Sequence, residues 1–272
     1  MKISFNTVKT ILVFLGTGIS FICVSCYQDV IDIDLSQIDK QIVIEGVITD
    51  RTSTCKVIIS ETSSIYHTES VRKISDAIIT ISDDQGNTES LSETEPGIYR
   101  NNSIIGYPGR IYTMEVYVNG KAYTAVSQMP VPLELDSIVY NLIYPYVPVP
   151  IILYFTDHKG IQDFCRFKIY NNYEYLENEK ILYYDKYTDG EIIKIDNIDE
   201  LFNRNDLLKV DLITIDKNIY DFYSVVYNYE DPESPEESVI DLASANPKSN
   251  INNNALGYFS AQTVRSYWVY IR

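Results

Sequence analysis

Residues that commonly carry catalysis are sparse in this sequence of 272 residues. Only two histidines are present, His67 and His158. A catalytic triad would need one of them beside a nucleophile and a carboxylate, and His158 precedes a turn closed by Gly160, where a solvated side chain is the favoured interpretation. The sequence also lacks the Gly-x-Ser-x-Gly elbow, the His-Glu-x-x-His motif, the Walker loop and the dinucleotide fingerprint. We therefore predict no catalytic residues, no cofactor and no enzymatic activity, with a hydrolase that uses His67 or His158 as the least favoured alternative.

Acidic side chains outnumber basic ones by 38 to 22, which gives a formal net charge of −16 at pH 7. This charge argues against nucleic acid as a partner, because binding to phosphates needs clustered Lys and Arg. Asp83, Asp84 and Gly86 could offer oxygen ligands to calcium in a turn, but the EF-hand spacing is missing and turn chemistry explains them without a metal. The acidic segment 230–241 is expected to be a solvated loop. We therefore predict no metal site.

The first 25 residues have the features of a targeting segment. Two lysines give it a positive start, and residues 11–24 form an apolar run shorter than the roughly 20 residues that a spanning helix needs. The run ends in Val24-Ser25-Cys26, which resembles the lipobox of bacterial lipoproteins. The resemblance implies that residues 1–25 are a lipoprotein signal peptide and that Cys26 is lipidated and becomes the mature N-terminus. An ordinary signal peptide, with Cys26 as a plain thiol, is the alternative.

Acyl chains on Cys26 would hold the protein on a bilayer, since each buried methylene adds about 0.8 kcal/mol. The later apolar runs are only as long as strands, so we expect the protein to be anchored without spanning. The body after residue 25 loses two lysines and no acid, so it carries 20 basic and 38 acidic side chains, a net charge of −18. Residues 26–38 form an acidic tether, which resembles the export signals of surface lipoproteins in Bacteroidota. The expected location is the cell envelope, with the lipid anchor in the outer membrane and surface exposure as the implied orientation.

Two further cysteines, Cys55 and Cys165, lie in predicted strands about 110 residues apart. A site outside the cytoplasm permits a disulfide between them. Cysteines in two separate domains are more often small buried hydrophobic residues, so we favour free thiols.

Tyrosine is the most unusual part of the composition, with 24 Tyr against 9 Phe. Seventeen of the tyrosines lie from Tyr140 onward. Tyrosine suits half-buried strand positions, and we assign most of them to that role. Tyr144 and Tyr146 lie in a Pro-rich stretch, where a rigid extended loop would lose little entropy on docking, so we predict that they contact a partner.

The mature chain is expected to be mainly β, with two antiparallel β-sandwich-like domains. The first covers residues 39–130 and is immunoglobulin-like, because short strands rich in Val, Ile, Thr and Tyr alternate with turn signals. Its clearest element is a type I′ hairpin around Asn119-Gly120, a pair that readily adopts positive φ at both turn positions. The strands expected here are residues 41–49, 55–61, 77–82, 111–118 and 121–127.

A linker is expected at about residues 128–136, where Pro130 and Pro132 would remove hydrogen-bond donors from a continuing strand. The second domain, residues 136–272, is β-rich and has a helix near residues 218–229, because apolar residues there fall at i, i+3, i+4 and i+7.

A second short helix is considered at residues 198–203. The pair Asp189-Gly190 predicts a hairpin between residues 181–187 and 192–195. The Pro-rich stretch 144–150 is either an edge strand or an extended loop. Further strands are expected at residues 151–156, 164–171, 258–261 and 264–271.

The ordered set of motifs resembles a family of Bacteroidota outer-membrane lipoproteins, the type with domain of unknown function 4249. This resemblance covers most of the mature chain and implies a supporting role in uptake or envelope traffic, because the family is often encoded beside TonB-dependent receptors. It supplies no catalytic residues. The matching features are Ile42-Val43-Ile44-Glu45-Gly46-Val47-Ile48-Thr49, residues 78–86, Gly97-Ile98-Tyr99, residues 112–118, Met129-Pro130, Tyr154-Phe155-Thr156-Asp157 and Ala255-Leu256-Gly257-Tyr258-Phe259-Ser260-Ala261.

The function expected from these features is that of a lipid-anchored outer-membrane protein that binds or assists without catalysis in a TonB-dependent receptor system. Its expected partners are the membrane, through Cys26, and the receptor. A surface adhesin or fimbria-associated subunit is the alternative.

Overall fold

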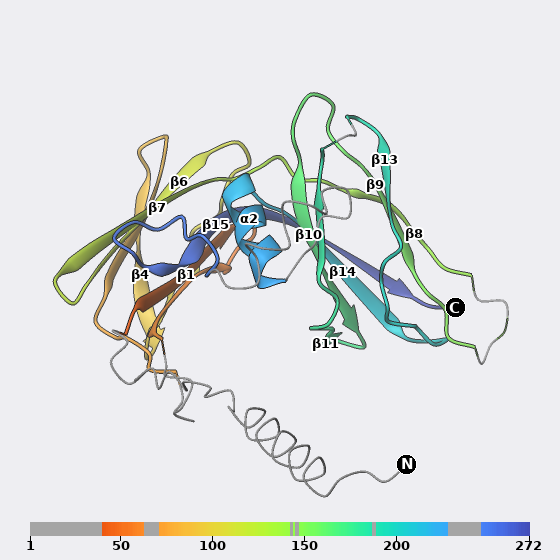
Figure 1. Ribbon diagram of the computed structural model, residues 1–272, viewed down its shortest axis with the longest axis horizontal. Coiled ribbons are helices and arrows are strands. Elements are labelled where there is room, and N and C mark those ends of the chain that lie inside the picture. The colour runs from red at the N-terminus through yellow and green to blue at the C-terminus, as the bar shows by residue number, and fades with distance from the viewer. Residues whose placement is uncertain (1–39, 63–70, 142–143, 145–146, 187–188, 228–245) are drawn as a thin grey trace, which may run out of the picture. The chain divides into compact units, whose positions relative to one another are not determined.

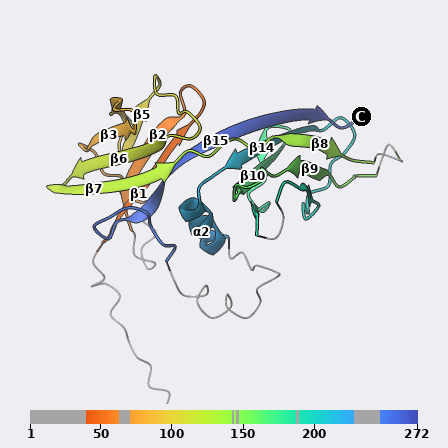
Figure 2. The same cartoon turned by 90° about the horizontal axis from the view of Figure 1, so that it is seen from above.

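The computed structural model describes residues 40–62, 71–141, 144, 147–186, 189–227 and 246–272. Its longest strand, β15 (Leu256–Tyr270), connects two parts of this body. The first half of β15 pairs in parallel with β1 (Ile42–Thr49). The second half pairs antiparallel with β14 (Leu207–Thr214). One strand therefore belongs to both parts of the body, and its long course from one part to the other is visible in Figure 1 and Figure 2.

The strands form one long ladder and one small sheet. The ladder has the order β11-β10-β14-β15-β1-β2-β5-β4-β3-β6-β7, with β12 added to β10, and the small sheet has the order β13-β9-β8. The other strands are β2 (Cys55–Glu61), β3 (Ile78–Asp83), β4 (Thr88–Glu95), β5 (Ile98–Asn101), β6 (Ile111–Val118), β7 (Lys121–Gln128), β8 (Leu135–Val139), β9 (Ile152–Thr156), β10 (Phe164–Asn171), β11 (Glu174–Tyr175), β12 (Ile181–Tyr184) and β13 (Ile192–Ile195).

The first core is enclosed by strands β1 to β7 together with the first half of β15. The ladder turns back on itself there, because the amide of Ala261 in β15 donates to Ser127 Oγ in β7 at 2.9 Å. Large buried side chains such as Ile44, Tyr99 and Met114 fill the space between the two faces. This arrangement of packed antiparallel strands is the expected β-sandwich.

The second core lies between β10, β14 and the second half of β15 on one side and the small sheet on the other (Figure 1). Phe155, Phe167 and Phe202 are fully buried in it. Two cores joined through shared strands agree with the predicted mainly β class.

One helix occurs in the described residues, α2 (Lys217–Val226). It begins after Asp216, whose carboxylate accepts a hydrogen bond from the Ile219 amide at 3.1 Å and thereby caps the helix. Ile219, Tyr220 and Tyr223 form its buried stripe and pack on the outer side of β10, β12 and β15. The helix predicted near residues 218–229 is therefore confirmed over residues 217–226.

The type I′ hairpin around Asn119-Gly120 is also confirmed. The two residues have φ values of 52° and 74°, and β6 pairs with β7 from Val118 opposite Lys121 onward. A turn of this kind depends only on neighbouring residues, which is why the sequence identifies it.

The hairpin predicted between residues 181–187 and 192–195 is wrong. Gly190 does have a positive φ of 74°, but β12 pairs with β10 and β13 pairs with β9. The turn therefore separates two strands that belong to different sheets.

Two further expectations need correction. Residues 198–203 are not helical, because Phe202 forms an isolated β-bridge with Val149 and its side chain is fully buried. Of the Pro-rich stretch 144–150, the described residues 147–150 form no strand apart from that bridge. The two closing strands predicted at residues 258–261 and 264–271 are one strand, β15, which continues without a break.

The end of the chain also packs outside the domain to which the sequence assigns it. Residues 136–272 are expected to form the second domain, whereas Ile251, Ala255, Phe259 and Ala261 pack into the first core. The parallel pairing of β15 with β1 brings them there. Among the described residues, no helix has the length and apolar character needed to cross a membrane.

Candidate functional site

The outer side of β10, β14 and β15 carries a regular array of basic and aromatic side chains. Because side chains alternate along a strand, Cys165, Phe167 and Ile169 point into the second core and their neighbours point outward. The strand register arranges the outward residues in three cross-strand rows. The rows are Arg166-Ile213-Val264, Lys168-Asp211-Ser266 and Tyr170-Lys209-Trp268. We call Arg166, Lys168, Tyr170, Lys209, Asp211, Ser266 and Trp268 the basic face.

Arg166 is the most unusual member of the basic face, because its side chain is buried without a carboxylate partner among the described residues. Only 5% of the residue is exposed. Its Cζ lies 4.1 Å from the centre of the Tyr223 ring in α2, and Nη1 donates to Tyr227 Oη at 3.4 Å. Its Nε has no hydrogen-bond partner in the described part of the chain. Burial opposes the charge of the guanidinium, but Tyr223, Tyr227 and Tyr258 favour it, so the pKa of Arg166 is raised overall and the side chain is charged in this buried place.

Lys168 lies one row away from Arg166 and is half-buried. Burial lowers the pKa of its ammonium group, and the charges of Arg166, Lys209 and Lys56 lower it further, while Asp211 opposes them. The Nζ atom lies 5.5 Å from the centre of the Tyr175 ring. The surroundings of Lys168 therefore disfavour the charged form of its side chain.

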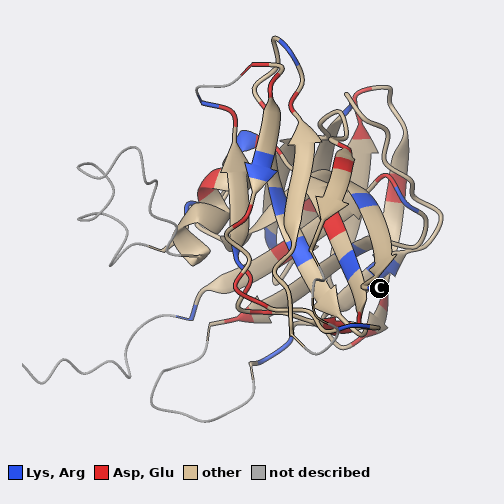
Figure 3. Cartoon of the chain, turned by 90° about the vertical axis from the view of Figure 1, so that its right-hand side faces the viewer, with Lys and Arg blue, Asp and Glu red and all other residues tan. Residues whose placement is uncertain are grey.

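Lys209 completes the group of cations on this face. Its Nζ lies 2.7 Å from Asp211, 4.2 Å from the centre of the Tyr170 ring and 5.4 Å from the centre of the Trp268 ring. Asp211 also accepts a hydrogen bond from Ser266. One carboxylate thus lies among three cations in a chain whose net charge is strongly negative. Such a site favours an anion. Figure 3 shows that basic and acidic positions are interspersed over the strands of the body.

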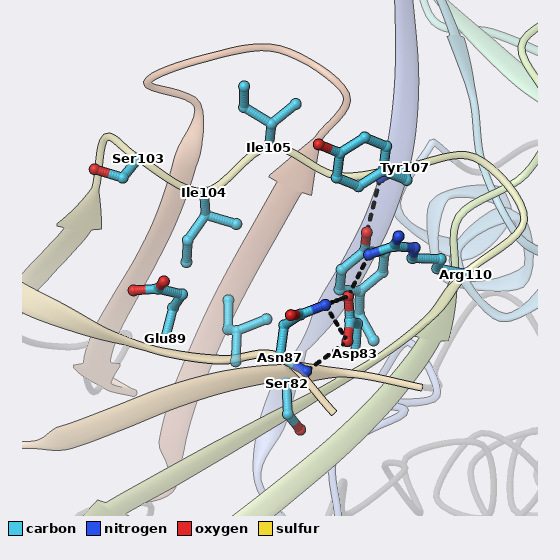
Figure 4. Close-up of a pocket in the computed structure, with 11 residues that line it drawn as sticks. Ser82, Asp83, Asn87, Glu89, Ser103, Ile104, Ile105, Tyr107 and Arg110 are labelled. Atoms are coloured by element: carbon cyan, nitrogen blue, oxygen red, sulfur yellow. Dashed lines mark hydrogen bonds and ion pairs between the residues drawn. The ribbon is translucent and has the colours of Figure 1, made fainter. Parts of the chain in front are cut away.

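A separate cavity of about 370 Å³ lies beside β3 and β6 in the first half of the body (Figure 4). Asp83 in its wall contacts Arg110 at 2.6 Å and accepts hydrogen bonds from the backbone amides of Asn87 and Gln85. Burial opposes ionisation, but these contacts and the Asn87 side chain lower the pKa of Asp83 to about 2. Neighbouring groups of the protein therefore already bind this carboxylate, as the turn interpretation predicts. No group of three or more His, Cys, Asp or Glu in the described part of the chain is arranged to hold a metal ion.

The residues singled out from the sequence do not belong to the basic face. Cys26, Tyr146 and His67 lie outside the described residues. Tyr144 is 66% exposed in a bend between β8 and β9, where its carbonyl accepts the Val147 amide at 3.2 Å. His158 is held in its turn by Asp163, at 3.0 Å from Nδ1.

The two cysteines of the body are free and buried, as predicted. Cys55 belongs to the first core and Cys165 to the second. Burial raises the pKa of Cys55 to about 12 and raises that of Cys165 as well. Both thiols are therefore unreactive in the folded protein.

Sequence reasoning missed the basic face, although part of its signal is visible. Within β10, Arg166, Lys168 and Tyr170 alternate with apolar residues, a pattern that places all three on one side of a strand. The contributions of β14 and β15 depend on strand register, which a single sequence does not specify.

Comparison of the sequence with known protein families identifies the family of this chain. The family described as "Domain of unknown function (DUF4249)" matches residues 28–267. The chain belongs to this DUF4249 family. No curated protein matches the chain. The predicted membership of the family with domain of unknown function 4249 is thereby confirmed.

Two solved structures are similar to this DUF4249 protein at low TM-scores. A segment of two fibronectin type-III domains from chicken tenascin is 11% identical, with a TM-score of 0.23, and the match covers 85% of this chain and 99% of that one. A mutant of Salmonella alpha-2-macroglobulin is 10% identical, with a TM-score of 0.22, and the match covers 65% of this chain and 14% of that one.

Proposed function

We propose that this DUF4249 protein is a lipid-anchored outer-membrane protein that binds an anionic ligand without catalysis and assists a TonB-dependent receptor. The observation that carries the binding part is the buried guanidinium of Arg166, which contacts aromatic rings and no described carboxylate. Lys168 and Lys209 extend the same positive region along two further rows of the sheet.

Compensation of charge is the physical basis of the proposed binding. A cation in a desolvated site destabilises the fold unless an anion balances it. Hydrogen bonds between charged partners contribute about 1.5–3 kcal/mol each, so an anion that reaches Lys168 or Lys209 gains binding energy from groups that are already fixed. The rigid sheet beneath them keeps the cations in place in the absence of ligand.

The location and the partner rest on other observations. The lipobox-like end of residues 11–24 supports an anchor on Cys26. The resemblance to lipoproteins encoded beside TonB-dependent receptors supports the accessory role. A binding face carried on a tethered body would present an anionic ligand close to the receptor.

Anion binding is tested by titrating the protein with sulfate and with citrate. We expect both to bind, and we expect Lys168→Gln to weaken binding about tenfold, which corresponds to about 1.4 kcal/mol. Lys121→Gln is the matched control, because Lys121 is exposed at the tip of the β6–β7 hairpin, away from the basic face. Absence of binding, or equal weakening in the two variants, would contradict the proposal.

The anchor and the receptor are tested in cells. Cys26→Ala should move the protein from the membrane fraction to the soluble fraction, because the acyl chains are lost. The wild-type protein should co-purify with a TonB-dependent receptor after extraction in mild detergent. Continued membrane attachment of the variant would contradict the anchor, and a solitary wild-type protein would contradict the accessory role.

A further inference from the structure

A tyrosine occupies a turn position that favours glycine, directly beside the basic face. The two-residue turn between β10 and β11 pairs Asn171 with Glu174. Its central residues, Asn172 and Tyr173, have φ values of 49° and 73°. Asn tolerates this left-handed region, whereas a bulky side chain such as Tyr is disfavoured there.

Packing does not explain this choice of residue, because Tyr173 is 74% exposed. Its ring contacts one neighbour that is itself half in solvent. The ring centres of Tyr173 and Trp268 lie 5.8 Å apart with an angle of 53° between their planes, and Trp268 is 50% exposed. Strained residues that bury little surface are found preferentially at functional sites.

The exposed aromatic pair adjoins the cations through Trp268. Lys209 lies opposite Trp268 in the strand register, with its Nζ 5.4 Å from the ring centre. Lys168 is two residues along β10 from Tyr170, which is the partner of Lys209, so the second cation lies about 7 Å further along the strands. A ligand that covers the aromatic pair and the two lysines therefore contacts the rings at one end and the positive charges further along the strands.

We infer that Tyr173 and Trp268 form a stacking platform for sugar rings and that the ligand is an acidic oligosaccharide. This inference rests on the proposed anion-binding function and names its ligand class. The flat rings offer large rigid contact areas to the apolar face of a sugar. Carboxylate or sulfate groups on the neighbouring sugars meet Lys209 and Lys168.

An acidic peptide fits this face less well, because the strands that carry Lys168 and Lys209 offer it no free edge. β14 pairs on both sides, with β10 and β15, and β10 pairs with β14 and with β11 and β12. A peptide therefore cannot add a strand beside these two lysines and gain main-chain hydrogen bonds there. Recognition must come from rings and charges, which a sugar chain with acidic groups supplies together.

Trp268 is the only tryptophan in the sequence, so its fluorescence reports on this platform. The test titrates the protein with a trimer of galacturonate, a neutral sugar trimer and a trimer of glutamate. We expect galacturonate to change the emission and to bind at least about tenfold more tightly than the other two, since only it combines ring stacking with charge.

The decisive variant is Tyr173→Gly, which removes the ring and also relieves the backbone. It should weaken galacturonate binding about tenfold while raising the melting temperature, because glycine is favoured at positive φ. Tyr117→Ala is the matched control, since Tyr117 is 52% exposed on β6 and remote in the ladder, and it should leave the affinity unchanged.

Three results would overturn the inference. They are equal binding of the glutamate trimer, an affinity for galacturonate that Tyr173→Gly does not change, and a melting temperature that falls in that variant. If citrate and sulfate still bind in a manner that depends on Lys168, the proposed anion binding stands and only the sugar assignment fails. If no anion binds, both fail.

Discussion

Single residues of the basic face lower the stability of the fold, because they carry charge where solvent is partly excluded. Lys168 is a clear case, because burial and the charges of Arg166, Lys209 and Lys56 all lower the pKa of its ammonium group. A residue kept in such a place is better explained by a ligand than by stability. Stability measurements can therefore detect the functional role of the residue without knowledge of the ligand.

We predict that Lys168→Met stabilises the protein at neutral pH by a few degrees in melting temperature. The pKa of Lys168 is lower in the folded state than its usual value of 10.5, so the protonated form destabilises the fold. This penalty is fully present below the folded pKa and disappears as the pH rises toward 10.5. Urea denaturation at neutral and at alkaline pH should show a stabilisation that shrinks with pH, and a variant less stable than wild type at neutral pH would contradict the argument.

Asp83 shows the opposite behaviour, because its contacts favour the charged form. We predict that Asp83→Asn destabilises the protein at neutral pH by about 1 kcal/mol, a modest value because the Arg110 side chain of the pair is 31% exposed. The contribution of Asp83 is present above its usual pKa of 3.8 and is lost as the pH falls toward about 2. The difference from wild type should therefore vanish in strong acid, and Asp84→Asn, which lacks these contacts, should have little effect at any pH.

At the scale of elements, the start of β15 depends on a close approach that only glycine allows. Gly257 has a φ of 94°, and a Cβ atom there would lie 2.1 Å from the carbonyl oxygen of Ile44 in β1. The parallel pairing of β1 with β15 therefore requires glycine at this position. Gly120 also has a positive φ, of 74°, but has open space around it.

The two glycines give a matched pair of variants. We predict that Gly120→Ala costs about 1 kcal/mol of unfolding free energy, from backbone strain alone. Gly257→Ala should cost more than about 3 kcal/mol, because the strands must also separate. Chemical denaturation of both variants measures the difference, and equal losses would show that the contact with Ile44 adjusts freely.

Elements whose form depends on neighbouring residues are the ones that the sequence predicts well. Asn119-Gly120 and the apolar stripe that begins at Ile219 both specify their structure within a few residues. The hairpin predicted at Gly190 is wrong because the strands on either side of the turn pair with β10 and β9 instead of with each other. The basic face was missed for the same physical reason, since register across β10, β14 and β15 brings its members together.

At the scale of the whole molecule, β15 makes the two cores depend on each other. Phe259 in its first half is buried in the first core, and Ile271, directly after its end, is buried in the second. A break in the pairing of β1 with β15 would therefore expose apolar surface in the first core and release the strand that pairs with β14. The cores should unfold together even though each has its own set of side chains.

The two buried thiols allow a direct test of this coupling, since Cys55 reports on the first core and Cys165 on the second. We predict that labelling of both thiols in a Cys26→Ala background shows the same urea midpoint, because neither core persists without β15. Phe259→Ala should cost about 3–5 kcal/mol, as expected for loss of a buried ring, and should lower both midpoints equally, although Cys165 lies in the other core. Labelling of Cys55 at a lower urea concentration than Cys165 would instead show that the first core opens alone and that β15 connects the cores without coupling them.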